Sequence, residues 1–179
     1  MGERLRRLGA VAQAVCAGTE RGLPVGHTLL QKLFYFLEHG KGRDLGYRYR
    51  LYHYGPYCQE VWADLSYLED VGAVSIRGGP NGYGYHIYAR EDIKGLVSFA
   101  DEDLRKQVNS LVEFLGGRSA RELECLATTH YVYKELRRAR QDSAPAWETV
   151  MQGVRALKPH LSEDEVRAAW QALQEKGLL

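Results

Sequence analysis

The sequence contains little cysteine and no long apolar run, and these two absences exclude several classes of protein. Its 179 residues include three cysteines, which lie far apart. A secreted disulfide scaffold would carry a denser, even set, so the sequence favours a cytoplasmic location. No run approaches the ~18 apolar residues that a membrane span needs, and no apolar signal-peptide core follows the charged N-terminus. We therefore expect no association with a membrane.

The chain also lacks an excess of either charge. It has 24 Lys and Arg against 23 Asp and Glu, which gives a formal net charge of +1. Domains that bind nucleic acid are usually strongly basic, so the composition gives no argument for such a partner. The 45% of hydrophobic and 26% of charged residues are typical of an ordinary globular protein.

Motifs for catalysis or metal binding are missing as well. The six histidines are scattered, and none forms a metal-ligand spacing with another candidate ligand. The Gly-rich segment 79–84 resembles a phosphate loop only superficially, because strands flank it and no Lys-Ser/Thr follows. Cys58 beside His53 could pair a nucleophile with a base, but a small core cysteine is the favoured interpretation. We predict a protein without catalytic residues, metal or cofactor, and not an enzyme.

The first half of the chain alternates helical patterns with short strand patterns. Apolar spacing predicts helices over 3–17, 28–38 and 57–71, and alternation predicts a strand over 47–54 that stops at Gly55-Pro56, where the third helix starts. Strands at 73–77 and 83–89 flank Asn81-Gly82, a strong hairpin signal because both turn residues accept a positive φ. Helix, helix, strand, helix, hairpin is the order of a winged helix-turn-helix domain. We therefore expect a winged-helix-like domain over residues 1–95.

The second half is predicted to be helical throughout. Apolar residues at helical spacing occur over 101–115, and Ser119 with Glu122 and Ser162 with Glu165 form two capping boxes that mark helix starts. We expect residues 96–179 to be a helical extension packed on the first domain, so that the two form one compact unit. The fold class is mainly α, of the α+β type, with a small β-sheet or hairpin.

The charge on the third predicted helix bears on the partner. In a winged-helix protein, the helix before the hairpin normally enters the major groove of DNA. Here that helix, 57–71, carries Glu60, Asp64, Glu69 and Asp70 but no Lys or Arg. Affinity for DNA comes largely from Lys and Arg at the phosphates, so DNA is a disfavoured partner.

A protein partner suits the same region better. Alternation places Arg48, Arg50, Tyr52 and Tyr54 on one face of the strand over 47–54. Aromatic residues and Arg are enriched in binding hot spots, and an acidic helix suits a basic partner. The alternative is that most of these tyrosines fill the core. The predicted partner-binding residues are Arg48, Arg50, Tyr52, Tyr54, Tyr57, Glu60 and Asp64.

The alternative function is a transcriptional regulator that binds DNA through the hairpin and basic clusters, as a dimer. Its nucleic-acid contacts would be Arg77, Arg137, Arg138 and Arg140. The run over 134–140 has a simpler explanation, because cations at a helix C-terminus complement the helix dipole. The sequence leaves a homodimer open.

Short motifs in residues 28–90 carry a resemblance to a known family. They are Leu30-Gln-Lys-Leu-Phe-Tyr-Phe-Leu, the turn Tyr54-Gly-Pro-Tyr57 after a Tyr-rich strand, and then Glu60 and Leu65. This pattern resembles the Panacea (SocA-like antitoxin) domain and the YwgA-like uncharacterised bacterial proteins. The resemblance implies a mostly helical, winged-helix-like protein without known catalysis. It also implies an antitoxin-like or adaptor-like role in protein–protein interaction.

Overall fold

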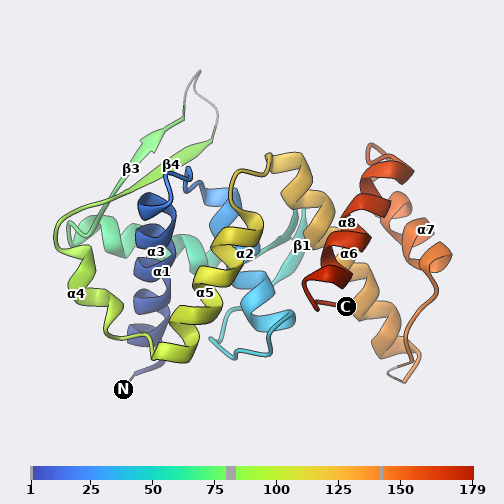
Figure 1. Cartoon of the computed structure of the whole chain (residues 1–179), viewed down its shortest axis with the longest axis horizontal. Helices are drawn as coiled ribbons and strands as arrows, with labels where there is room; N and C mark the ends of the chain where they lie inside the picture. The colour runs from blue at the N-terminus through green and yellow to red at the C-terminus, as the bar shows by residue number, and fades with distance from the viewer. Residues whose placement is uncertain (1, 80–83, 142) are drawn as a thin grey trace. The chain divides into compact units, whose positions relative to one another are not determined.

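The structure is a computed structural model that describes residues 2–79, 84–141 and 143–179 (Figure 1). It is mainly helical, with 61% helix and two small two-stranded hairpins, which confirms the mainly helical class. The helices and strands in the described residues are α1 (Glu3–Glu20), α2 (His27–His39), β1 (Arg50–Tyr52), β2 (Gly55–Tyr57), α3 (Gln59–Asp70), β3 (Val74–Gly78), β4 (Tyr85–Ala89), α4 (Ile93–Val97), α5 (Glu102–Leu115), α6 (Ala120–Ala139), α7 (Trp147–Leu157) and α8 (Glu163–Glu175).

The chain divides into two compact units. The first unit comprises Met1–Arg50 and Tyr57–Gly117, and the second comprises Leu51–Pro56 and Arg118–Leu179. The boundary therefore differs from the one predicted at residue 95, because α4 and α5 both pack against α1 and belong to the first unit. The segment Leu51–Pro56 belongs to the second unit although it lies in the first half of the sequence.

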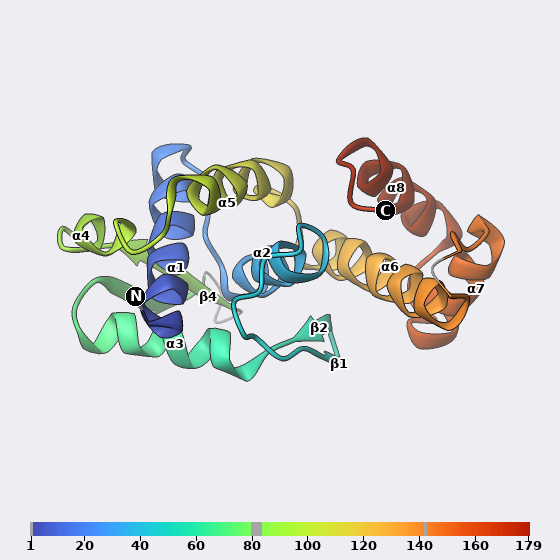
Figure 2. The same ribbon diagram turned by 90° about the horizontal axis from the view of Figure 1, so that it is seen from below.

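The core of the first unit is built around α2. All positions from Leu29 to Leu37 are buried, as expected for a helix with an unusually wide apolar stripe. Both α3 and α5 pack against α2, and Figure 2 shows α2 lying between them. The buried stretch includes Gln31 and Lys32, whose side chains are polar.

The hairpin of β3 and β4 is confirmed in position and pairing. The strands are antiparallel, with Val74 opposite Ala89 and Gly78 opposite Tyr85. The predicted turn at Asn81-Gly82 lies outside the described residues. On its other side, β4 pairs with the segment between α1 and α2, where the Ile87 N–H donates to the Val25 carbonyl at 2.9 Å. This pairing attaches the hairpin to the helices of the first unit.

The predicted strand over 47–54 is replaced by a tighter hairpin. Only Arg50–Tyr52 of that segment forms a strand, β1, and Gly55–Tyr57 forms its partner β2. The prediction that Gly55-Pro56 starts the third helix is wrong, since α3 begins at Gln59. Gly55 has φ +82°, which glycine adopts readily, and a proline is tolerated in a short edge strand.

The second unit is a set of three helices, α6, α7 and α8, which pack against one another. Both capping boxes are confirmed, since Ser119 and Ser162 cap α6 and α8 and the reciprocal Glu contacts are present. Tyr133, Trp147 and Trp170 form an aromatic cluster, in which the ring centroids of Tyr133 and Trp147 lie 5.8 and 5.7 Å from that of Trp170.

Candidate interaction surface

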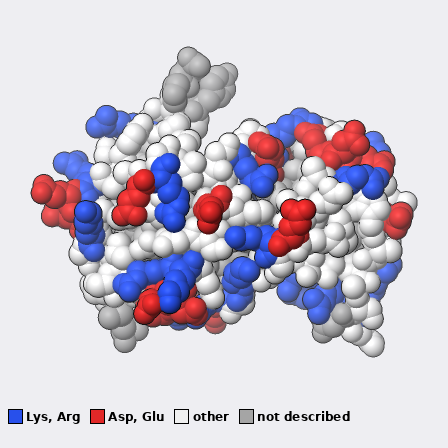
Figure 3. Space-filling model, viewed as in Figure 1, with Lys and Arg blue, Asp and Glu red and all other residues white. Residues whose placement is uncertain are grey.

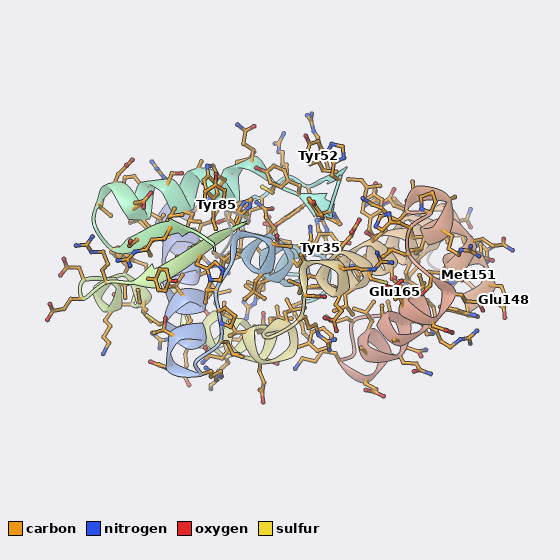
Figure 4. The ribbon with its side chains drawn as sticks, turned by 90° about the horizontal axis from the view of Figure 1, so that it is seen from above. Tyr35, Tyr52, Tyr85, Glu148, Met151 and Glu165 are labelled. Atoms are coloured by element: carbon orange, nitrogen blue, oxygen red, sulfur yellow. The ribbon has the colours of Figure 1, made fainter. Side chains whose placement is uncertain are left out.

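The residues predicted to bind a protein partner are divided between the two units. Of the seven, Tyr52 and Tyr54 belong to the second unit and the other five to the first. Tyr52 and Tyr54 are 60% and 62% exposed on the β1–β2 hairpin, and Tyr52 is labelled in Figure 4. Arg48 and Arg50 are exposed as well, so all four residues predicted to share one face of the strand lie at the surface. Glu60 is exposed and Tyr57 is half-buried.

Asp64 has to be removed from the predicted surface because its side chain is buried. Its carboxylate accepts hydrogen bonds from Arg7 Nε at 2.9 Å and from the Tyr47 hydroxyl at 3.0 Å. Arg4 Nε lies 3.8 Å from the same carboxylate. A buried carboxylate must be paired, and here α1 supplies the arginines. The negative charge of Asp64 is thus compensated inside the first unit.

The outward side of α3 keeps the remaining carboxylates. Glu60, Glu69 and Asp70 are exposed, and the helix contains no Lys or Arg. Trp62 is half-buried and Tyr67 is 40% exposed on the same side. We call these five residues, Glu60, Trp62, Tyr67, Glu69 and Asp70, the α3 face.

Two of these carboxylates also have internal partners. Glu60 Oε2 accepts a hydrogen bond from Cys58 Sγ at 3.0 Å, and this bond holds the pKa of Glu60 below its usual value. Glu69 Oε1 accepts one from the Ile76 N–H of β3 at 2.7 Å. The contact with Cys58 favours the ionised form of Glu60, so this end of the α3 face carries negative charge at neutral pH.

The α3 face continues onto the second hairpin through aromatic contacts. The ring of Trp62 lies 5.2 Å from that of Tyr85 on β4 and 4.7 Å from that of His27 at the start of α2. Tyr57 lies 5.9 Å from His27 on the other side. Tyr85, which is labelled in Figure 4, is 50% exposed, so this aromatic cluster is open to solvent in part.

Sequence reasoning did not select Trp62, Tyr85 or His27 as functional. The strand period gave no signal for Tyr85, because it places this residue on the same face of β4 as the buried Ile87. None was available for His27 and Trp62, whose contact joins residues from different elements.

His27 is held in its neutral form by its surroundings. Burial, followed by the nearby Lys32 ammonium, lowers the pKa of His27 to about 4. Its Nε2 lies 3.2 Å from Gln31 Nε2. The Gln31 side chain in turn bonds both the N–H and the carbonyl of Cys58, at 2.9 and 2.8 Å. These bonds connect α2 to the start of α3.

We expect the first unit to lose stability below neutral pH because of His27. The unfolded chain binds a proton near pH 6.5 and the folded chain only near pH 4, so stability is full above pH 6.5 and falls as the pH drops towards 4. Since the side chain is only half-buried, the expected loss is about 1–2 kcal/mol after allowance for screening by solvent. Urea unfolding at pH 7 and pH 4 should show this loss in the wild type and a smaller one in His27→Gln. An equal loss in both would contradict the assignment.

The geometry gives no support to Cys58 as a nucleophile. Burial, followed by the hydrogen bond to Glu60, raises the pKa of Cys58 to about 11. The thiolate is the reactive form of cysteine, so Cys58 is a thiol at neutral pH. The side chain is buried and packs in the core.

The residues of the nucleic-acid alternative also lie in both units. Arg77 is exposed on β3 in the first unit, with its guanidinium 5.3 Å from the centre of the Tyr88 ring. Arg137, Arg138 and Arg140 lie at the end of α6 in the second unit, where Arg138 pairs with Glu135 at 3.4 Å. Basic and acidic side chains are interspersed on the face that Figure 3 shows.

In the part of the chain that the structure describes, no group of three or more His, Cys, Asp or Glu is placed to hold a metal ion. Nor is any of the described helices long and apolar enough to cross a membrane. No protein-family model matches the sequence, and no curated protein matches it closely enough to indicate a relative. The resemblance to the Panacea and YwgA-like families therefore stays a prediction.

Proposed function

We propose that the protein is a non-catalytic interaction module of winged-helix-like architecture, and that the α3 face binds a basic segment of a protein partner. The observation that carries the proposal is the combination on one helix of exposed carboxylates, partly exposed aromatic rings and no cation. Arginine and lysine side chains bind such surfaces through ion pairs and cation–π contacts. An antitoxin-like or adaptor-like role would fit the family resemblance.

The first unit contains an internal example of this chemistry. The guanidinium of Arg4 lies 4.5 Å from the centre of the Tyr67 ring, and its Nε lies 3.8 Å from Asp64. An arginine from α1 is thus held on α3 by a ring and a carboxylate. A partner's arginine would find the same two kinds of group in the partly exposed ring of Trp62, with Tyr85 beside it, and in the exposed carboxylates of α3.

Selection from a displayed peptide library against the whole protein tests the proposal. We expect enriched peptides to carry Arg or Lys, and to bind about tenfold more weakly when Trp62→Ala removes an aromatic contact of hot-spot strength. Trp147→Ala in the second unit is the matched control and should leave the affinity unchanged. Enriched peptides without basic residues, or peptides that bind the Trp62→Ala variant equally well, would refute the proposal.

The second candidate function is binding to duplex DNA. The burial of Asp64 favours it, because Arg7 neutralises one of the four carboxylates on α3 that were expected to repel phosphates. The two functions respond oppositely to Glu60→Gln/Glu69→Gln/Asp70→Asn. Removing these charges weakens the binding of a basic peptide but strengthens that of DNA. Titration of this variant with a selected peptide and with a DNA duplex at low salt therefore distinguishes them.

A further inference from the structure

The β1–β2 hairpin is anchored to the helices of the second unit by a buried lysine. Lys158 follows α7 directly, and its ammonium donates hydrogen bonds to the main-chain carbonyls of Tyr52, at 3.0 Å, and of His53. These carbonyls are more than one hundred residues away along the chain. The side chain of Lys158 is only 9% exposed.

The third partner of the ammonium is a carboxylate from α6. Lys158 Nζ lies 3.0 Å from Glu124 Oε1, and the Glu124 side chain is 4% exposed. The other oxygen, Oε2, lies 3.2 Å from His160 Nε2. The ammonium thus donates two hydrogen bonds to the hairpin and forms an ion pair with α6, so the lysine links the hairpin, α6 and the end of α7.

The anchor holds the main chain of the hairpin and leaves its side chains outside. Both hydrogen bonds from Lys158 end on carbonyl oxygens, and neither depends on which side chain stands at position 52 or 53. Tyr52 and Tyr54 remain 60% and 62% exposed. Hydrogen bonds to the main chain therefore fix the position of Tyr52 and Tyr54 and leave their rings exposed.

Stability alone is a poor reason for such a pair. Removing a lysine and a glutamate from water is so unfavourable that apolar residues of similar size often give an equal or greater stability. Buried ion pairs are best attested where they select one arrangement over others. Here the contacts to the carbonyls of Tyr52 and His53 select one arrangement of the turn between β1 and β2.

We propose that Lys158 is a positioning residue that latches the β1–β2 hairpin onto the second unit and thereby fixes the two exposed tyrosines. Release of the hairpin would leave the ammonium and the Glu124 carboxylate with fewer partners in a buried site. The position of the hairpin and the packing of α6 against the end of α7 are therefore coupled, and displacement of one disturbs the other. The latch is independent of the function assigned to the α3 face.

Hydrogen exchange of the full chain, followed by mass spectrometry, tests the latch. In Lys158→Met, peptides that cover residues 50–57 should exchange roughly tenfold faster or more, because the hairpin opens locally. Lys134→Met is the matched control, since Lys134 is exposed on α6 of the same unit, and it should leave exchange unchanged. Unchanged exchange over residues 50–57 in Lys158→Met would overturn the proposal.

A second variant separates positioning from stability. Lys158→Met leaves the buried carboxylate of Glu124 without its ion-pair partner. Lys158→Met/Glu124→Leu also removes that carboxylate, so the thermal stability should recover relative to Lys158→Met. If Lys158 positions the hairpin, residues 50–57 continue to exchange fast in this stable double variant. Recovery of slow exchange there would show that the pair is an ordinary part of the core, and the latch would be rejected.

Discussion

Replacement of Asp64 by asparagine is expected to lower the free energy of unfolding of the first unit by about 3 kcal/mol, because it removes the buried carboxylate of the partly buried Arg7, whose other ion pair is with the exposed Glu3. Asp64 accepts bonds from Arg7 and Tyr47, and its own side chain is only 4% exposed. Asparagine has almost the same shape, so the loss reports charge rather than packing. The measurement is urea unfolding followed by the fluorescence of Trp62, with Trp147 and Trp170 replaced by phenylalanine.

Asp70→Asn is the control for this prediction. Asp70 lies on the same helix but is exposed, and substitutions of exposed residues usually change stability by less than about 0.5 kcal/mol. A double-mutant cycle with Arg7→Met should give a large coupling energy for Arg7 with Asp64 and almost none with Asp70. Equal effects of the two aspartate substitutions would mean that Asp64 is solvated in solution.

The inward position of Asp64 could have been read from the sequence in part. Val61, Leu65 and Leu68 form the buried stripe of α3, and Asp64 falls three residues after the first and four before the last. The helical period therefore places it on the buried side. The arginine that neutralises it lies 57 residues earlier in the sequence, and nothing local indicates that partner.

Features whose partners are close in sequence were predicted, and features whose partners are distant were missed. The two capping boxes were predictable because both members lie within one helical turn. The β3–β4 hairpin was predictable because its strands are close along the chain. By contrast, Lys158 stands between Leu157 and Pro159 with no local signal, since its carbonyl partners belong to the other half of the sequence.

The α3 face was only partly predictable for a related reason. Its charge follows from the sequence, because four acidic residues on a helix without a cation can be counted directly. Which of them point outward depends on the packing of α1 and β3 against α3, which pairs Asp64 with the distant Arg7 and Glu69 with the Ile76 N–H. The surface available to a partner therefore differs from the predicted one, since it lacks Asp64 and gains Trp62, with Tyr85 of β4 beside it.

The second large effect is expected at Gly9, where α1 approaches the end of α4. A Cβ at this position would lie 2.6 Å from the Ala100 nitrogen and 2.8 Å from the Phe99 carbonyl carbon. Both are main-chain atoms, so no rotation of a side chain relieves the contact. Gly9→Ala should destabilise the first unit by about 1–3 kcal/mol through overpacking, measured by the same unfolding assay.

Gly95→Ala, in α4, is the control for Gly9→Ala and should not destabilise the first unit. A Cβ at Gly95 meets nothing within 4 Å, and alanine favours a helix over glycine by about 0.8–1 kcal/mol in the helix interior, so this change should be neutral or stabilising. The contrast also tests the division of the chain. If the segment that follows α4 did not pack against α1, a Cβ at Gly9 would meet no main-chain atom and Gly9→Ala would be tolerated. A clear loss at Gly9 and none at Gly95 requires instead that α4 and α1 share one core.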